Sequence, residues 1–441
     1  MNLFKALRVS SQPLVAFVGA GGKTTAMFKL ARELKPPVIV TATTHLAAEQ
    51  AKLADRHLPV QSTSELQNFY AAETAVTLIT GPVKAERTEP LNPVVLSWLR
   101  EKCEANGWPL LIEADGSRSQ PLKAPAEHEP PIPAFVDLVV VVAGLSGLGR
   151  PVSEEWIHRP EIFASLAETQ PGKTVSPQDV VLVLSHAEGG LKNIPAGARR
   201  VALLNQADNA DLQAAAGKMA RQLLPAFKTV VVASLKQNMI YSAHEEVAGI
   251  ILAAGASQRF GRTKQLLDWR GQPFVRAVAR TALAAGLSPV IVLTGADSQN
   301  VEAALSGLPI QIVRNEDWRE GQASSIRAGV SQLAASNESG AAIFLLVDQP
   351  QVTASILNAL VEAHSLALPP VLAPLVMDQR ANPVLFDRVT FGDLLELKGD
   401  VGGRAIFSKY RIEYLPWHDD RLLLDVDTPE QYARLVSDNT L

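Results

Sequence analysis

Two segments of the chain place a loop of small residues between a short apolar run and a lysine. The first is Leu14-Val-Ala-Phe-Val-Gly-Ala-Gly-Gly-Lys-Thr-Thr25, and the second is Gly249-Ile-Ile-Leu-Ala-Ala-Gly-Ala-Ser-Gln-Arg-Phe-Gly-Arg-Thr-Lys-Gln265. Small residues let backbone N–H groups approach phosphate oxygens, and a lysine adds positive charge beside them. We therefore expect two α/β units, each with a phosphate site where a strand ends.

The rest of the chain supports two units of this class. Short runs rich in Val, Ile and Leu alternate with longer amphipathic stretches, which is typical of β-α units that feed a parallel sheet. The 441 residues exceed what one core usually holds, and the alternation lapses over residues 235–247. We therefore predict two domains, residues 1–240 and 247–441. The predicted strands are 14–18, 38–42, 110–113, 138–142, 180–184, 201–204, 229–233, 250–253, 290–294, 310–314, 343–347, 371–373 and 423–426.

Charge and composition exclude several classes of protein. Asp and Glu number 45 against 41 Lys and Arg, so no surplus of positive charge is available to hold a nucleic-acid backbone. A single cysteine, Cys103, forms no internal disulfide, and the apolar runs are shorter than a membrane span. We therefore predict a cytoplasmic protein with neither nucleic acid nor membrane as a partner.

The second glycine loop carries two cations, Arg259 and Lys264. Cations at this place would offset the charge that builds on a phosphorus atom and on departing pyrophosphate. Taken alone, the segment could also be an ordinary strand-to-helix turn with two solvated cations. Downstream, Asp348 closes an apolar run and should emerge at the carboxyl edge of a central strand, where ligands of open α/β sheets bind. This favours a site for a triphosphate and a divalent cation.

The same loop resembles the L-A-A-G-x-S-x-R-x-G-x-x-K signature of the nucleotidyltransferases that activate molybdenum cofactor. The signature positions are occupied by Leu252, Ala253, Ala254, Gly255, Ser257, Arg259, Gly261 and Lys264. Five further segments match that family in order, at residues 321–326, 347–350, 380–384, 399–404 and 425–430. Ala381 and Gly403 depart from the family pattern, but each exchanges one small residue for another. The resemblance implies a Rossmann-like, GT-A-like domain.

This resemblance also implies a reaction, the transfer of a nucleotidyl group to the phosphate of molybdopterin with release of pyrophosphate. Lys264 and Arg259 would screen charge, and no general base is needed because a phosphate monoester is already anionic at neutral pH. Asp348 and Asp427 would hold Mg²⁺, although Asp427 could instead cap the helix expected to start at residues 428–430. The Leu-Ala-Ala-Gly form is similar to the cytidylyltransferases, so Ala254 favours CTP.

Four other residues are candidates for substrate contacts in this half. Ser324 or Ser325 could donate a hydrogen bond to the base or ribose, although either could equally be a helix N-cap. Asn382 and Arg404 are candidates for holding the anionic pterin, although Arg404 could instead be a surface charge.

The first glycine loop is shorter than the usual P-loop, because Phe17 stands where that pattern needs a glycine. Its spacing instead looks like the loop of the Mur ligases. Lys23 and backbone N–H groups would hold phosphates and Thr24 could reach Mg²⁺, which predicts a P-loop NTPase-like domain for ATP or GTP. The predicted nucleotide-binding residues are Gly19, Gly21, Gly22, Lys23, Thr24, Thr25, Glu113, Asp115, Asn205 and Asp208.

Two of these predictions have plain alternatives. Glu113 and Asp115 end an apolar run as a Mg²⁺ or water-orienting pair would, but they could instead be cap or turn acids. Asn205-Gln-Ala-Asp208 resembles the N-K-x-D guanine reader, with Gln206 in place of lysine. That replacement weakens a preference for guanine, and the segment could also be only a polar turn.

Residues 113–130, a Pro-rich stretch, and residues 41–45 resemble the family of selenium-dependent hydroxylase accessory proteins. The resemblance implies an association with molybdenum hydroxylases. His45 and His128 lie in these segments, but lone histidines in unrelated loops are more often structural or exposed. The sequence thus supports a cytidylyltransferase with an NTP-driven partner domain. The alternatives are a cofactor-binding chaperone for an apo-hydroxylase, or a guanylyl- or sugar-phosphate nucleotidyltransferase on the same fold.

Overall fold

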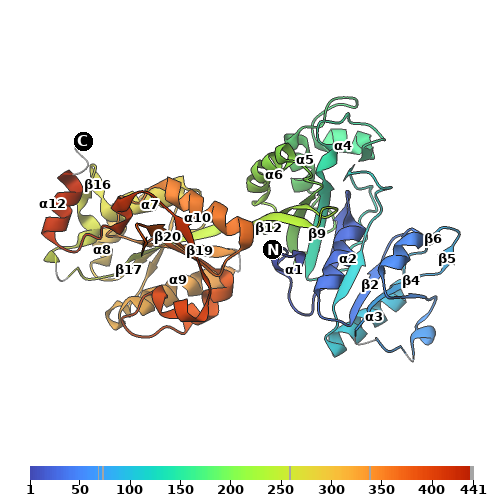
Figure 1. The fold of residues 1–441 in the computed structure, drawn as a ribbon, viewed down its shortest axis with the longest axis horizontal. Helices are drawn as coiled ribbons and strands as arrows, with labels where there is room; N and C mark the ends of the chain where they lie inside the picture. Colours follow the sequence, from blue (N-terminus) through green and yellow to red (C-terminus); the bar gives the residue numbers. More distant parts are fainter. Residues whose placement is uncertain (68, 72–73, 258–259, 337–338, 438–441) are drawn as a thin grey trace. The chain divides into compact units, whose positions relative to one another are not determined.

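The structure is a computed structural model that describes residues 1–441 except 68, 72–73, 258–259, 337–338 and 438–441. The chain divides into two compact units, Met1–His244 and Glu245–Leu441 (Figure 1). Each unit contains its own sheet and its own hydrophobic core. Among the described residues, no helix has the length and apolar character needed to cross a bilayer.

The first unit is built on a nine-stranded sheet in the order β13-β12-β11-β9-β1-β7-β2-β4-β3. Neighbouring strands are parallel except β12 and β13, which are antiparallel. The strands are β1 (Leu14–Gly19), β2 (Val38–Ala42), β3 (Arg56–Pro59), β4 (Val76–Thr80), β7 (Leu110–Glu113), β9 (Leu138–Gly144), β11 (Arg199–Asn205), β12 (Thr229–Ser234) and β13 (Met239–His244). Two-residue strands form the pairs β5 (Val83–Lys84) with β6 (Arg87–Thr88) and β8 (Leu122–Lys123) with β10 (Ile157–His158).

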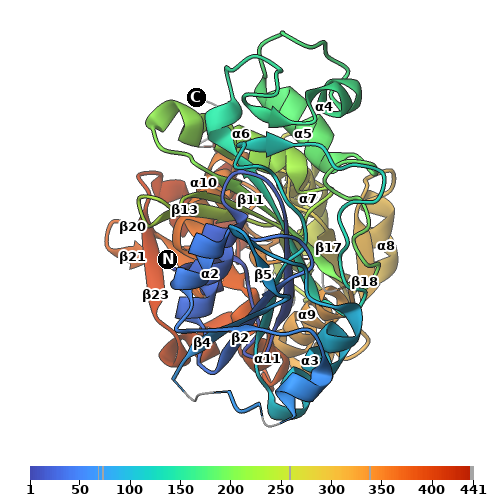
Figure 2. The same ribbon diagram turned by 90° about the vertical axis from the view of Figure 1, so that its right-hand side faces the viewer.

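Helices cover both faces of this sheet. They are α1 (Leu3–Ala6), α2 (Lys23–Glu33), α3 (Pro93–Asn106), α4 (Pro160–Leu166), α5 (Pro177–Ser185) and α6 (Ala210–Leu223), with 3₁₀ turns η1 (Ala48–Leu53), η2 (Thr63–Leu66) and η3 (Leu145–Gly147). Helices α3 to α6 share one core with alternate residues of β1 and β9, and α4, α5 and α6 lie side by side (Figure 2). Helix α2 instead contacts β1, β2 and β7 directly after the first glycine loop.

The second unit contains an eight-stranded mixed sheet in the order β18-β17-β14-β19-β22-β20-β21, with β23 paired to β20. Strand β22 is antiparallel to both of its neighbours, and β21 is antiparallel to β20. The strands are β14 (Val247–Ala253), β17 (Val290–Thr294), β18 (Gln311–Arg314), β19 (Ala341–Leu346), β20 (Val371–Val376), β21 (Gln379–Arg380), β22 (Val384–Asp387) and β23 (Ile412–Pro416), beside a small pair β15 (Asp268–Trp269) and β16 (Gln272–Pro273).

Period-2 alternation along β14 separates two layers of helices in this unit. Ile251 belongs to a core shared with α7 (Phe274–Ala284), α8 (Ser298–Ala304), α10 (Ala354–Ala367) and α12 (Pro429–Ser437), whereas Ile250 belongs to a core shared with α9 (Gln322–Ser336) and α11 (Phe391–Leu395). The remaining turns are η5 (Lys264–Leu266), η6 (Trp318–Glu320), η7 (Arg388–Thr390), η8 (Gly403–Lys409) and η9 (Asp420–Leu423). The chain leaves β14 toward β17 and returns on the other side at β19, which creates a topological switch point at its carboxyl end. The α/β class and the Rossmann-like second unit are confirmed.

Three predicted features are wrong in detail. The run 180–184 belongs to helix α5, because Ser176 and Asp179 form a capping box and Pro177 occupies the first turn. Residues 423–426, predicted as a strand, pair with no strand, because Leu423 ends η9 and the amide of Val426 donates to the carbonyl of Asp348 at 3.2 Å. The polar stretch 235–247 contains β13, whose antiparallel pairing makes the sheet mixed rather than parallel.

Candidate functional site

The second unit has an open cleft of about 740 Å³ at its switch point. Its lining includes the end of β14 and the loop that follows, Lys264 in η5, Asp348 after β19, and Asp427 before α12. Parallel strands bring their carboxyl ends to one edge of a sheet, so residues that are distant in the sequence meet there. Of the loop residues predicted to hold a nucleotide, the cleft lining includes Leu252, Ala254, Gly255 and Ser257. Ala253 is fully buried beneath them.

Lys264 joins the two predicted metal-binding carboxylates. Its Nζ lies 2.8 Å from Oδ1 of Asp427 and 3.2 Å from Oδ2 of Asp348. Burial disfavours the charged ammonium, but the two carboxylates outweigh burial and raise the pKa of Lys264. Burial also raises the pKa of Asp348, against the opposing effect of Lys264. The structure therefore places a permanent positive charge in contact with both acids inside the cleft.

Asp427 points to the cleft and not to the helix that follows it. Its carboxylate contacts Lys264, while the hydroxyl of Thr428 accepts a hydrogen bond from the amide of Gln431 at 3.3 Å. The amides of Asp427 and Thr428 both donate to Oε1 of Gln431, at 2.7 and 2.9 Å. In this geometry Thr428 caps α12, which leaves the carboxylate of Asp427 available to a cation.

The two acids fit a hard divalent cation. Oδ1 of Asp348 is buried and accepts no hydrogen bond, and the side chain of Asp427 is 48% exposed. Among residues within the described ranges, no group of three or more His, Cys, Asp or Glu is arranged to hold a metal. A cation bound by Asp348 and Asp427 would receive two protein carboxylates, with its other positions left for phosphate oxygens and water.

Gln265 shapes the glycine loop, although the sequence did not single it out as a site residue. Its side chain is buried, and its Nε2 donates to the carbonyls of Ala253 at 2.9 Å and Gly255 at 2.7 Å. The hydroxyl of Ser257 donates to Oε1 of Gln265 at 3.1 Å and accepts from the amide of Lys264 at 3.0 Å. Without the side chain of Gln265, the carbonyl oxygens of Ala253 and Gly255 would have no hydrogen-bond donor and would repel an anionic ligand. Gln265 directly follows the signature lysine, and this position in the sequence could have identified it as a site residue.

Of the remaining predicted residues of this unit, some line the cleft and others lie outside it. Ser324 and Ser325 are buried, and their hydroxyls accept from Nδ2 of Asn315 at 2.8 and 2.9 Å, but the cleft lining includes only Ser325 of the two. Asn382 is half-buried and Arg404 is exposed, and neither is part of the cleft lining. The cleft also includes Trp318, Arg319 and Asp400, which sequence reasoning missed. Arg259 lies outside the described residues.

The first glycine loop needs its glycines. Gly19, Gly21 and Gly22 have φ of +94°, +81° and +122°, a region that residues with a side chain rarely adopt. A Cβ on Gly19 would lie 2.2 Å from the carbonyl oxygen of Val142, and one on Gly22 would lie 2.5 Å from Nδ2 of Asn205. The loop is therefore pressed against the ends of β9 and β11, and helix α2 begins directly after it at Lys23.

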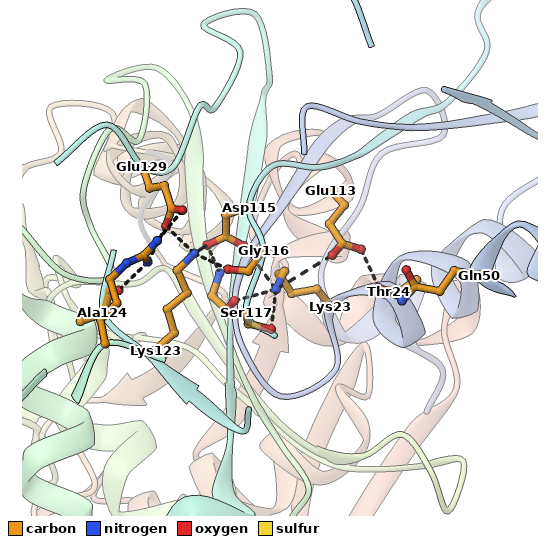
Figure 3. A network of polar contacts seen from close by, with 12 residues as sticks. Lys23, Thr24, Gln50, Glu113, Asp115, Gly116, Ser117, Lys123, Ala124 and Glu129 are labelled. Atoms are coloured by element: carbon orange, nitrogen blue, oxygen red, sulfur yellow. Dashed lines mark hydrogen bonds and ion pairs between the residues drawn. The ribbon is translucent and has the colours of Figure 1, made fainter. Parts of the chain in front are cut away.

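Lys23 is the centre of a buried polar network (Figure 3). Its Nζ donates to the carbonyl of Gly19 at 2.7 Å and to the hydroxyl of Ser117 at 3.2 Å, and it lies 3.3 Å from Oδ1 of Asp115. The neighbouring hydroxyl of Thr24 donates to Oε2 of Glu113 at 2.6 Å. Thus the lysine, threonine and acid pair predicted from two separate segments do meet around the loop. Thr25 is exposed at the start of α2.

Asp115 continues this network into the Pro-rich segment. Its Oδ2 accepts from the amide of Gly19 at 3.0 Å and lies 2.8 Å from Nζ of Lys123. Lys123 also lies 2.7 Å from Glu129, which Arg159 binds through two hydrogen bonds of 2.8 Å. These alternating charges hold the segment to the loop.

Acidification should weaken the first unit through this cluster. Burial, together with the nearby charge of Arg159, lowers the pKa of His158 to about 4 from 6.5. In the unfolded chain the imidazole of His158 takes up a proton near pH 6.5, whereas in the folded chain it does so only near pH 4. The free energy of unfolding should therefore fall as the pH drops from about 6.5 toward 4. Burial opposes ionisation of Glu129, but Arg159 and Lys123 lower the pKa of Glu129 to about 2, so a second loss follows below about 4.5.

The measurement is the free energy of unfolding of the full chain by denaturant at pH 7, 5.5 and 4. His158→Gln, which carries no titrating group at this position, should show a smaller loss of stability between pH 7 and 4 than the unmodified chain. Equal losses in the two proteins would refute the role of His158.

Other predicted residues have structural partners. Nδ2 of Asn205 donates to the carbonyl of Gly21 at 2.7 Å, and Oδ1 of Asp208 accepts from the hydroxyl of Ser234 at 2.5 Å. Nδ1 of His45 lies 3.0 Å from the carbonyl of Thr88, and His128 is exposed. Cys103 is buried in α3, and burial raises the pKa of its thiol to about 12, which disfavours the reactive thiolate.

Comparison with known proteins assigns a family to each half. Residues 15–161 match the family model described as YqeC protein, and residues 249–414 match the MobA-like NTP transferase domain. The chain is 35% identical over 221 residues to the uncharacterized protein YqeC of Escherichia coli, an alignment that covers 45% of this chain and 79% of that protein.

The second half has its own relatives. It is 33% identical over 207 residues to the nicotine blue oxidoreductase of Paenarthrobacter nicotinovorans, covering 43% of this chain and 96% of that protein. It is 24% identical over 201 residues to a probable molybdenum cofactor guanylyltransferase of Bacillus mycoides, again covering 43% of this chain and 96% of that protein. The chain therefore belongs to the YqeC family through its N-terminal half and to the MobA-like NTP transferases through its C-terminal half.

Proposed function

We propose that the second unit transfers CMP from CTP to the phosphate of molybdopterin and releases pyrophosphate. The observation that carries this proposal is the contact of Lys264 with both Asp348 and Asp427 in the switch-point cleft. A cation beside two carboxylates, next to a loop of small residues, suits a triphosphate with its divalent metal. Kinship with a probable molybdenum cofactor guanylyltransferase supports a pterin acceptor.

In the proposed reaction an oxygen of the pterin phosphate attacks the α-phosphorus of CTP. A new phosphorus–oxygen bond forms, and the bond from the α-phosphorus to the bridging oxygen breaks, so the electron pair leaves with pyrophosphate. A Mg²⁺ ion held by Asp348 and Asp427 would supply Lewis-acid stabilisation of the phosphate oxygens. The chain contributes the ammonium of Lys264 against the developing charge and a loop, braced by Gln265, that receives the phosphates.

The choice of CTP rests on Ala254 in the Leu-Ala-Ala-Gly loop. GTP is the alternative that the relative from Bacillus mycoides favours. We further propose that the first unit is a P-loop NTPase-like domain for ATP or GTP, and that it acts in the cytoplasm with an apo molybdenum hydroxylase. The network around Lys23, Thr24 and Glu113 supports the phosphate-binding part of this proposal.

The decisive assay supplies Mg²⁺ and each nucleoside triphosphate in turn, with and without molybdopterin, and follows pyrophosphate. We expect pyrophosphate from CTP only when molybdopterin is present, and little from ATP, GTP or UTP. Release from GTP instead would transfer the proposal to a guanylyltransferase. No pterin-dependent pyrophosphate from any nucleotide would reject the transferase and leave a cofactor-binding chaperone.

A further inference from the structure

The end of β11 lies against the first glycine loop, and the end of β12 is joined to it through the same residue, Asn205. Asn205, the last residue of β11, is 4% exposed. Its Nδ2 donates to the carbonyl of Gly21 at 2.7 Å, and its Oδ1 accepts from the amide of Leu235 at 3.0 Å. One buried amide therefore joins the loop to the strand ends beyond it. Strands β9 and β11 lie between β1 and β12, so the end of β12 is about 14 Å, three strand spacings, from the end of β1 where the loop begins.

That distance suits the sugar and base of a nucleotide whose phosphates rest on the loop. The strand edge at this place carries a carboxylate, Asp208, whose Oδ1 accepts from the hydroxyl of Ser234 at 2.5 Å. Ser234 is fully buried, whereas Asp208 is exposed. The bond spans 26 residues of sequence, so it does not belong to a local polar turn. It aims an exposed carboxylate from a fixed position on the sheet edge.

A fixed carboxylate selects among the bases by donor and acceptor chemistry. An ionised carboxylate accepts hydrogen bonds and donates none. Guanine offers two adjacent donors, its N1–H and its 2-amino group, which can bind the two oxygens of one carboxylate. Adenine presents an acceptor at N1 beside its 6-amino group, so one oxygen would face a lone pair. Asp208 therefore fits guanine better than adenine.

The presence of Gln206 in place of lysine does not oppose a preference for guanine. Its Oε1 accepts from the hydroxyl of Ser146 at 2.5 Å, and a Cβ added to Gly144 would lie 2.4 Å from the same oxygen. The side chain thus packs against the turn after β9, beside the glycine loop. Its departure from lysine leaves the carboxylate of Asp208 and the anchoring amide of Asn205 in place.

We propose that the first unit binds a guanine nucleotide. Its phosphates occupy the loop of Gly19 to Lys23, and its N1–H and 2-amino group donate to the carboxylate of Asp208. Asn205 is a positioning residue that keeps the base site and the phosphate site in register. This inference rests on the proposed phosphate site of this unit and adds the identity of the base.

The test measures binding of GDP, ADP and XDP to the full chain by calorimetry, and only the binding that Lys23→Ala abolishes is assigned to the first unit. Asp208→Asn is the informative variant, because an amide keeps one acceptor and gains one donor. Xanthine carries a carbonyl where guanine carries its 2-amino group, so the amide pairs with xanthine. We expect Asp208→Asn to weaken GDP by about 10- to 100-fold and to strengthen XDP by a similar factor.

Two further variants keep the outcomes distinct. Asp211→Asn changes an exposed acid in the first turn of α6 and should leave all three affinities unchanged. Lys23→Ala should abolish binding of all three nucleotides to the first unit. If GDP and ADP bind equally and Asp208→Asn alters neither, the guanine assignment is wrong while the phosphate site stands. If no nucleotide binds in a Lys23-dependent way, the phosphate site itself is wrong and the guanine assignment with it.

Discussion

Replacement of Lys264 by alanine is expected to lower kcat/KM for pterin-dependent pyrophosphate release by about 10²- to 10³-fold. The ammonium is the charge that contacts both Asp348 and Asp427, and its pKa is raised, so it remains protonated over the whole useful pH range. Its removal takes away the group that would oppose charge developing on pyrophosphate. The assay is the release of pyrophosphate from CTP with molybdopterin and Mg²⁺.

Lys409→Ala provides the matched control for this variant. Lys409 forms an exposed ion pair with Asp393 and is not part of the cleft lining, so its loss should leave turnover unchanged. Binding of Mn²⁺, followed by electron paramagnetic resonance, should survive in Lys264→Ala because both carboxylates remain. Pyrophosphate release at an undiminished rate in Lys264→Ala would show that this cleft does not carry the reaction.

Asp348→Asn is expected to reduce turnover by about 10²- to 10³-fold through a different cause, the loss of a metal ligand. Oδ1 of Asp348 is buried with no hydrogen-bond partner, and a neutral amide in place of the carboxylate removes its negative charge and one of the two oxygens offered to a cation. The variant is nearly isosteric, and folding should be preserved. The measurements are turnover and the Mn²⁺ dissociation constant.

Metal concentration separates the two variants. High Mn²⁺ should restore part of the turnover of Asp348→Asn, since Asp427 remains, but should not restore Lys264→Ala. The same exchange at the half-buried Asp393 should change neither measurement, because its carboxylate is bound to Lys409 and Tyr410 outside the cleft. Unchanged Mn²⁺ affinity in Asp348→Asn would remove this acid from the proposed metal site.

Local sequence patterns predicted the strands that carry function. Buried strands of a parallel sheet form continuous apolar runs, so β1, β7, β14 and β19 could be recognised without the structure. Short apolar runs suit helices as well as strands, and only the capping box at Ser176 explains why residues 180–184 form a helix. Strands β3 and β4 were not predicted, although β4 is buried throughout.

The amino-acid sequence by itself determined the two glycine loops, their lysines and the acids at the strand ends, because each depends on neighbours a few positions away. Tertiary structure alone decided which of these groups meet. Lys264 and Asp427 are 163 residues apart, and Asn205 reaches a glycine 184 residues before it. The folding of each sheet sets such contacts, since strand order determines which carboxyl ends are neighbours. The capping role of Thr428 and the bracing role of Gln265 likewise depend on side-chain directions that no local pattern specifies.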